Sequence, residues 1–198
     1  MEKVDLIWLN KEFVEWDKAK VHFLSQALHY GGAVFEGIRC YRTSTGPAIF
    51  RLGAHLDRLY NSAKIMGLRP PVSEKETEKI IFELIMRNKL SECYIRPLMF
   101  FGYGVIGLST KGANVEYGIA AWPWGKYLGD EGFDMGISAK VSSFSRHHPN
   151  IMMTKAKISG NYANSILAKM EAVNDGYDEA VMLDSNGLVA ECSGENIF

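Results

Sequence analysis

The sequence has few of the features that mark secreted or metal-binding chains. Its three cysteines, Cys40, Cys93 and Cys192, are odd in number and form no CxxC pair, so neither a disulfide framework nor a zinc site is expected. We expect them to be small buried side chains in a reducing compartment. His147 and His148 are adjacent, so on a strand they would point in opposite directions, and no third ligand has a useful spacing. We therefore expect no metal centre.

Long apolar runs and an excess of one charge are also absent. No run is long enough to span a bilayer, and the first ten residues, MEKVDLIWLN, have no apolar stretch typical of a signal peptide. The 22 basic and 23 acidic side chains leave a formal net charge of −1. Binding to a phosphate backbone needs a basic face. We expect a cytoplasmic protein that binds neither nucleic acid nor membrane, although a local basic pocket remains compatible with this balance.

What the chain does have is enough apolar material for a core. Hydrophobic residues make up 47% of its 198 residues and aromatic residues 12%, which suits one large domain or two modest ones. Residues 5–10 and 12–16 alternate apolar and polar side chains around a turn, which predicts a hairpin. Residues 33–41 and 48–52 flank the turn-forming RTSTGP and predict a second hairpin.

The period then changes to that of a helix. Residues 55–66 carry apolar side chains at helical spacing, and Gly67 follows as a natural stop. Ser73 and Glu76 form a capping box, which predicts an amphipathic helix that continues to residue 90.

In the rest of the chain, some segments have the apolar spacing of strands and others that of helices. We expect strands over 93–103, 115–124 and 135–144, a helix over 160–176 and a last hairpin of 179–184 with 188–198 around the turn SNG. Residues 125–134 are polar and rich in glycine, so we place a domain boundary near residue 130. A second domain of about 68 residues is small for an independent core, and we expect the chain to be cut short.

The stretch TKAKISGNY, residues 154–162, places Lys155 and Lys157 directly before a predicted helix. A lysine amine attacks a carbonyl only when it is neutral, so its pKa of about 10.4 must be lowered by burial or by a nearby cation. Ile158, Tyr162 and Ile166 are expected to supply apolar walls, while Ser159 and Gly160 permit a close approach. From the residues alone, an ordinary surface lysine is the favoured interpretation.

The segment KISGNY resembles the lysine motif of the fold-type IV pyridoxal-phosphate aminotransferases, in which the lysine stands five residues before the tyrosine of Gly-Asn-Tyr. Residues 29–41, HYGGAVFEGIRCY, are similar to the early strand of the branched-chain members of this family. Further similar segments follow in the family's order at 55–65, 94–102, 120–129 and 188–198. The resemblance implies an α+β fold with an N-terminal domain over 1–130 and an incomplete cofactor-binding domain over 131–198.

The resemblance also implies a cofactor, pyridoxal 5′-phosphate, and residues that hold it. It selects Lys157 as the catalytic lysine that forms the Schiff base and leaves Lys155 as a solvated charge. Arg58, at the border of its helix's apolar stripe, would bind the phosphate, since arginine supplies permanent forked donors. Tyr162 would donate to the phenolic oxygen of the cofactor.

A carboxylate is implied at the pyridine nitrogen, which it keeps protonated so that the ring can accept electrons. Glu191 opens the segment ECSGEN and is favoured for this role, with Glu195 as its competitor. Asn196 would support the same cofactor site.

For the substrate, the resemblance implies a dry aromatic wall and a cation. Arg96 would meet a side-chain carboxylate, Tyr94 would help to position the α-carboxylate, and Leu108 lies in a loop that reaches the neighbouring subunit. The role of Arg39 is left open. The wall is formed by Tyr30, Phe35, Trp124, Tyr127 and Tyr162.

The activity implied is transamination of leucine, isoleucine and valine with 2-oxoglutarate, which gives branched 2-oxo acids and L-glutamate. In this reaction Lys157 moves a proton between the substrate α-carbon and the cofactor. A homodimer or a higher homo-oligomer is implied as well. Three alternatives stay open: a D-amino-acid aminotransferase, an aminodeoxychorismate lyase, or a fragment without catalytic activity.

Overall fold

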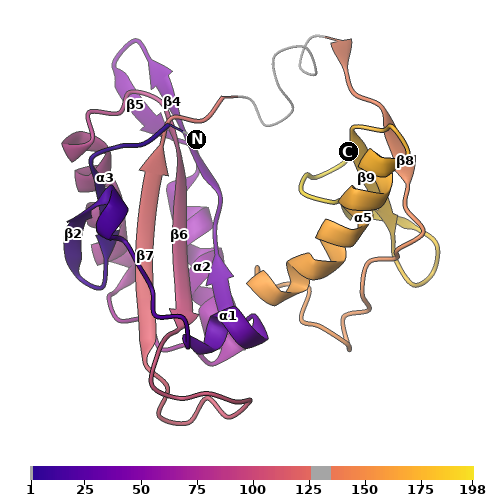
Figure 1. The fold of residues 1–198 in the computed structure, drawn as a ribbon. Helices are drawn as coiled ribbons and strands as arrows, with labels where there is room; N and C mark the ends of the chain where they lie inside the picture. The colour runs from indigo at the N-terminus through magenta and orange to yellow at the C-terminus, as the bar shows by residue number, and fades with distance from the viewer. Residues whose placement is uncertain (1, 126–134) are drawn as a thin grey trace. The chain divides into compact units, whose positions relative to one another are not determined.

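The structure is a computed structural model that describes residues 2–125 and 135–198 (Figure 1). It divides into two compact units. The first unit contains Met1–Trp124 and Lys155–Gly160, and the second contains Gly125–Thr154 and Asn161–Phe198. The boundary expected near residue 130 falls outside the described residues and stays a prediction.

A seven-stranded antiparallel sheet forms the centre of the first unit, in the order β2-β1-β7-β6-β4-β5, with β3 also paired to β6. Both predicted hairpins are confirmed, because β1 pairs with β2 and β4 pairs with β5. Asn10 and Lys11 join the first pair with φ angles of 50° and 76°, as a tight hairpin turn of two residues requires. The strands are β1 (Leu6–Leu9), β2 (Glu12–Glu15), β3 (Ala33–Phe35), β4 (Ile38–Thr43), β5 (Gly46–Ile49), β6 (Cys93–Phe101) and β7 (Val115–Trp122).

The prediction of one continuous strand over residues 33–41 was wrong. The strand is interrupted at Glu36 and Gly37, so that β3 and β4 pair with separate parts of β6. The residue opposite the interruption is Pro97, whose carbonyl accepts a hydrogen bond of 3.1 Å from the Glu36 N–H. Because proline has no N–H, it cannot return a hydrogen bond to the neighbouring strand.

Two helices pack against this sheet and share its core. Leu56 and Leu59 of α2 (Leu52–Met66) and Leu84 of α3 (Glu74–Arg87) are fully buried in one apolar cluster with the strand residues Ile38 and Ile95. The expected helix ends are confirmed, since the α2 helix stops at Gly67 in the left-handed conformation and Ser73 Oγ accepts a hydrogen bond from the Glu76 N–H. Two short helices, η1 (Trp16–Lys18) and α1 (Gln26–Tyr30), complete the unit.

The second unit contains a three-stranded sheet in the order β10-β9-β8 and one longer helix. Its elements are β8 (Ala139–Val141), α5 (Tyr162–Asn174), β9 (Glu179–Leu183) and β10 (Val189–Cys192), with the 3-10 turn η2 (Ser159–Asn161) directly before α5. The predicted last helix and last hairpin are confirmed, but the second strand of the hairpin ends at Cys192 and not at residue 198.

The strand predicted over residues 135–144 is much shorter, because β8 ends at Val141. The carboxylate of Glu171 accepts hydrogen bonds from the Ser142 hydroxyl at 2.5 Å and from the Ser143 N–H at 3.0 Å. The Ser142 N–H still donates to the Val181 carbonyl of β9 at 2.9 Å, and the next N–H, that of Ser143, bonds to the Glu171 side chain, so the regular pairing ends there.

The segment that contains Lys157 belongs to the first unit and is tied to it through the backbone. The Phe35 N–H donates to the Lys157 carbonyl at 3.1 Å, and the Lys157 N–H donates to Ser62 Oγ of α2 at 3.0 Å. Val34 and Ile158 form an isolated β-bridge beside them. Lys157 is thus held between β3 and α2.

Gly31 and Gly160 permit this attachment. The Gly160 N–H donates to the Gly31 carbonyl at 3.2 Å, and a Cβ on Gly31 would lie 2.7 Å from the Gly160 Cα. Gly31 also has a φ of +68°, which a residue with a side chain adopts only at a cost. A glycine at position 31 is therefore required both for the local conformation and for the backbone contact.

We expect Gly31→Ala to lower the free energy of unfolding by about 2–4 kcal/mol, since it adds left-handed strain to a backbone clash. Gly67→Ala is the matched control, because Gly67 has a φ of +73° but open space around its Cβ position. Urea unfolding of both variants would measure the difference. An equal loss in the two variants would contradict the close contact with Gly160.

Candidate functional site

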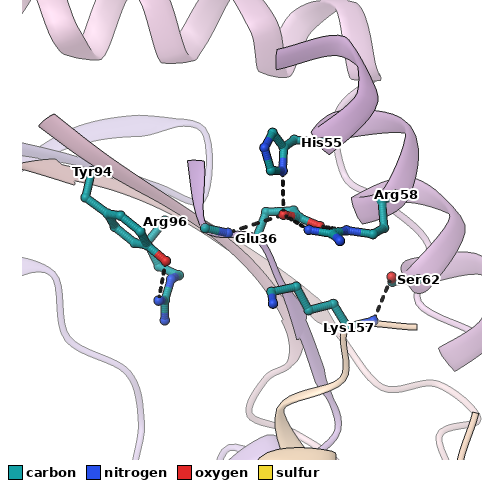
Figure 2. A network of polar contacts seen from close by, with 8 residues as sticks. Glu36, His55, Arg58, Ser62, Tyr94, Arg96 and Lys157 are labelled. Carbon is teal, nitrogen blue, oxygen red and sulfur yellow. Dashed lines mark hydrogen bonds and ion pairs between the residues drawn. The ribbon is translucent and has the colours of Figure 1, made fainter. Parts of the chain in front are cut away.

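Lys157 lies over an aromatic ring of the first unit. Its side chain is partly buried, and Nζ is 5.1 Å from the centroid of the Phe35 ring. Figure 2 shows the side chain running from beside Ser62 toward Glu36. A cation over a ring face interacts favourably with its electrons. Lys155, two residues earlier, is exposed.

The apolar neighbours expected for Lys157 divide between the two units. Ile158 is buried in the core of the first unit with 6% exposure. Tyr162 and Ile166 belong to the second unit, so their place next to Lys157 stays a prediction. Phe35 is the aromatic side chain that the structure brings to the lysine.

Arg58 forms an ion pair with a buried carboxylate on the strand side of the site (Figure 2). Its Nη2 donates to Glu36 Oε2 at 2.7 Å and its Nε donates to Glu36 Oε1, so the contact is bidentate. His55, one turn earlier on α2, places its Nδ1 2.8 Å from Glu36 Oε2. The Glu36 side chain is completely buried, whereas that of Arg58 is 50% exposed.

Burial by itself would raise the pKa of Glu36. The hydrogen bonds from His55 and Arg58 outweigh this effect and hold the pKa of the carboxyl below its usual range. Glu36 is therefore ionised at neutral pH, and its buried charge is compensated by Arg58.

The sequence alone did not point to Glu36, because helical spacing identifies only those ion-pair partners of Arg58 that lie on its own helix. The partner comes from the interruption between β3 and β4, more than twenty residues earlier in the chain. One signal was present: Glu36 is the only charged residue in the run AVFEGI over 33–38. A charge inside an apolar run predicts a buried ion pair.

Tyr94 and Arg96 form a second polar group beside the lysine. Arg96 Nη2 donates to Tyr94 Oη at 2.8 Å, and the guanidinium carbon is 4.6 Å from the centroid of the Phe35 ring. Arg96 Nε is buried without a hydrogen-bond partner among the described residues. Such a donor is costly to leave unpaired, so the site is suited to an anionic ligand.

An aromatic cluster supports this group. The Tyr94 ring lies 5.2 Å from that of Trp122 and 4.7 Å from that of Trp124. Arg39, whose role was left open, donates from Nη1 to the Trp124 carbonyl at 3.0 Å. The structure therefore brings together Phe35, Tyr94, Arg96 and Trp124, which the sequence predicted for one site.

The remaining predicted substrate residues are less enclosed. Tyr30 is 46% exposed at the end of α1, and Leu108 is 83% exposed in the loop between β6 and β7. Their contact with a substrate or with a neighbouring subunit stays a prediction. Tyr127 lies outside the described residues.

In the second unit the two glutamates of ECSGEN have different surroundings. Glu191 on β10 pairs with Nε of Arg146 and is partly exposed. Both carboxyl oxygens of Glu195 are buried without a hydrogen-bond partner among the described residues. Tyr162 begins α5 and Asn196 is exposed after β10. The approach of Glu191, Tyr162 and Asn196 to the cofactor stays a prediction.

Glu195 lies close to a second acidic side chain. Glu179 is buried and accepts a hydrogen bond from Lys169 Nζ at 2.7 Å. Burial, followed by the interaction with the Glu179 carboxyl group, raises the pKa of Glu195 to about 7. Glu195 is therefore the carboxyl group of this segment that titrates near neutrality.

The family Amino-transferase class IV matches residues 33–198, and the chain belongs to that family. It is 50% identical over 193 residues to the branched-chain-amino-acid aminotransferase of Pseudomonas aeruginosa, covering 98% of this chain and 63% of that protein. With the Escherichia coli K12 enzyme of the same name it shares 48% identity over 200 residues, covering 100% of this chain and 64% of the relative. The chain thus spans less than two thirds of the length of these relatives.

Solved structures agree in fold. The branched-chain amino acid aminotransferase of Escherichia coli superimposes with a TM-score of 0.94 at 46% identity, over 97% of this chain and 64% of that one. The branched-chain amino acid aminotransferase of Thermobaculum terrenum, solved in its PLP-form, gives a TM-score of 0.86 at 30% identity. This match covers 98% of this chain and 63% of that one. The predicted fold-type IV architecture with an incomplete second domain is confirmed.

Two further findings concern the described residues only. None of their helices combines the length and the apolar character that crossing a membrane requires. No group of three or more histidine, cysteine, aspartate or glutamate side chains among them could hold a metal ion.

We expect Gly37→Ala to lower the free energy of unfolding by about 1–3 kcal/mol, because its Cβ would lie 2.0 Å from Tyr94 Oη. Tyr94→Phe removes the atom that the Cβ meets. The double variant should therefore recover most of the Gly37→Ala loss in a double-mutant cycle of urea unfolding. Strictly additive losses would exclude this contact.

Glu195→Gln tests the raised pKa. A carboxyl group whose pKa rises from 4.5 in the unfolded chain to about 7 in the folded protein reduces stability as the pH increases through this window. We expect Glu195→Gln to raise the melting temperature at pH 8 by about 2–4 °C, equivalent to about 1 kcal/mol, and to change it little at pH 4.

Glu191→Gln is the matched control for that measurement. It loses an ion pair with Arg146, so it should show no gain at pH 8. If both variants responded alike, Glu195 would not be the group under electrostatic strain.

Proposed function

We propose that the protein to which this chain belongs is an aminotransferase that uses pyridoxal 5′-phosphate to exchange amino groups between branched-chain L-amino acids and 2-oxoglutarate. One observation carries the proposal: Lys157 Nζ and the Arg96 guanidinium lie over the same Phe35 ring, at 5.1 and 4.6 Å from its centroid. An amine and a cation suited to a carboxylate thus both contact one aromatic ring. The names of the relatives support the substrate class.

The first unit has residues suited to such a cofactor. An open pocket of about 760 Å³ beside Arg58 is lined by Asn61 and by the cations of Arg58, Lys64 and Lys155, with Asp57 as its only acid. Arginine and lysine at one pocket favour a phosphate. Lys157 supplies the amine for a Schiff base with the aldehyde. The Thermobaculum terrenum relative was solved in its PLP-form, which is consistent with this assignment.

The cofactor, when bound, holds the substrate amine covalently and accepts electrons from the substrate α-carbon. The amine of Lys157 would take up the proton that leaves this carbon and would deliver it to the cofactor carbon C4′, so that the substrate loses two electrons as the cofactor gains them. Backbone hydrogen bonds to Phe35 and Ser62 fix the lysine main chain. The side chain therefore starts from a fixed main-chain position, which lowers the entropy cost of reaching a reactive geometry.

The substrate needs an apolar surface and a cation in one place. The rings of Phe35, Trp124 and Tyr30 offer the first for a branched side chain. Arg96, with its buried Nε and its hydrogen bond to Tyr94, offers the second for a carboxylate. We assign the side-chain carboxylate of glutamate or 2-oxoglutarate to Arg96 and the α-carboxylate to Tyr94.

Further assignments complete the proposal. Glu191 keeps the pyridine nitrogen protonated, Tyr162 donates to the phenolic oxygen, and Asn196 supports the same face of the cofactor. Tyr127 belongs to the substrate pocket, and Leu108 reaches a partner subunit in a homodimer or higher homo-oligomer. We place the enzyme in the cytoplasm.

The competing activities are those of a D-amino-acid aminotransferase and an aminodeoxychorismate lyase. The relatives named above favour the branched-chain substrate. A screen of the full-length protein with L-leucine, D-alanine and aminodeoxychorismate would separate the three. Activity with none of them, together with no absorbance change on adding pyridoxal phosphate, would instead indicate a non-catalytic protein.

We expect Lys157→Ala in the full-length protein to remove the Schiff-base absorbance band and to lower kcat at least about 10²-fold, since proton transfer by a positioned group contributes about 10²–10⁴-fold. Lys79→Ala is the control and should keep both, because Lys79 is exposed on α3 and is not among the residues that line this pocket. Spectra and steady-state rates with L-leucine provide the measurement. An intact band in the Lys157→Ala variant would refute the assignment.

A further inference from the structure

We propose that Glu36 is a positioning residue, whose buried carboxylate fixes the Arg58 guanidinium in the orientation that binds the cofactor phosphate. This inference rests on the proposed function of the site. It extends that function to a residue that has no contact with the reacting atoms.

The geometry of the pair is that of a fixed fork. Glu36 accepts from Nε and from Nη2 of Arg58, which together form one edge of the planar guanidinium. Two parallel hydrogen bonds stop the plane from rotating. Nη1 lies on the opposite edge, so holding the first edge also sets the direction of the second.

Glu36 is itself held from several sides. Its N–H donates to the Pro97 carbonyl at 3.1 Å, and its Oε2 lies 2.8 Å from His55 Nδ1 and 3.3 Å from the Gly37 N–H. The side chain is completely buried. The carboxylate therefore serves as a fixed support at the interruption between β3 and β4.

Arg58 needs such a support because its own side chain is 50% exposed. A long, half-exposed arginine samples many rotamers, and a ligand that orders it must compensate for the lost entropy. An arginine that is already ordered by Glu36 binds phosphate without that cost.

The electrostatic effect of Glu36 has the opposite sign. Its negative charge, close to Arg58, repels a phosphate dianion, while Lys64 and Lys155 line the same pocket and attract it. If charge were the main contribution of Glu36, removing it would strengthen phosphate binding. If orientation is the main contribution, removing it weakens phosphate binding, so the sign of one measurement separates the two.

The experiment titrates the full-length apoprotein with pyridoxal phosphate and with pyridoxal, which lacks the phosphate, and follows Schiff-base absorbance. We expect Glu36→Gln to raise the Kd for pyridoxal phosphate at least about 10-fold and to change that for pyridoxal less than about 2-fold. Glu83→Gln is the matched control, because Glu83 forms a comparable pair with Arg87 at the exposed surface of α3. It should leave both constants unchanged.

A second variant of Glu36 keeps the test valid if Glu36→Gln folds poorly. Glu36→Asp preserves the charge, but its side chain is one methylene too short for the bidentate contact. We expect this variant also to weaken the binding of pyridoxal phosphate more than that of pyridoxal. With Arg58→Gln already present, Glu36→Asp should cause no further loss of phosphate selectivity, since it acts through Arg58.

The outcomes also separate this inference from the function on which it rests. Wild-type protein that forms no Schiff base with either compound would overturn the proposed function. The role of Glu36 alone would be overturned by a second result. In that case Arg58→Gln would weaken the binding of pyridoxal phosphate, whereas Glu36→Gln and Glu36→Asp would leave it unchanged or strengthen it. If the Glu36 variants weakened the binding of pyridoxal and of pyridoxal phosphate equally, the site would be disrupted in general. That result would also overturn the role of Glu36.

Discussion

Pro97 cannot donate a backbone hydrogen bond, and the polar groups of the first unit are arranged around that missing donor. The strand opposite it is interrupted at Glu36 and Gly37. Glu36 then turns its carboxylate to α2, where Arg58 and His55 meet it. Gly37 leaves room for the Tyr94 hydroxyl, which accepts a hydrogen bond from Arg96. Arg58 and Arg96, the two cations that we propose for phosphate and for substrate, thus both depend on one irregularity in the sheet.

The lysine is joined to this arrangement by its main chain. Phe35, the last residue before the interruption, donates to the Lys157 carbonyl and places its ring next to Nζ. The close contact of Gly31 with Gly160 permits the two backbones to meet. Residues more than one hundred positions apart in sequence are therefore fixed relative to one another by a few short-range contacts within one compact unit. The lysine amine therefore has a defined position over the Phe35 ring.

The helices and hairpins were predictable because their signals are local. The capping box at Ser73, the stop at Gly67 and the turn at Asn10 each depend on neighbouring residues, and each was confirmed. Two strand predictions failed at positions with distant partners. Pro97 interrupts the strand over 33–41, and the Ser143 N–H that follows β8 bonds to Glu171 on α5. Periodicity cannot reveal a donor that is missing in another strand.

The sequence by itself determined the family, through its lysine motif and the order of its segments, and it predicted a site of Lys157, Arg58, Tyr94 and Arg96. It also determined the local elements on which they stand. Only the tertiary structure decided their partners. Glu36 was found as the partner of Arg58, and Phe35 as the ring shared by Lys157 and Arg96, because ion pairs and ring contacts depend on distance in space, which the spacing of residues along a chain does not fix.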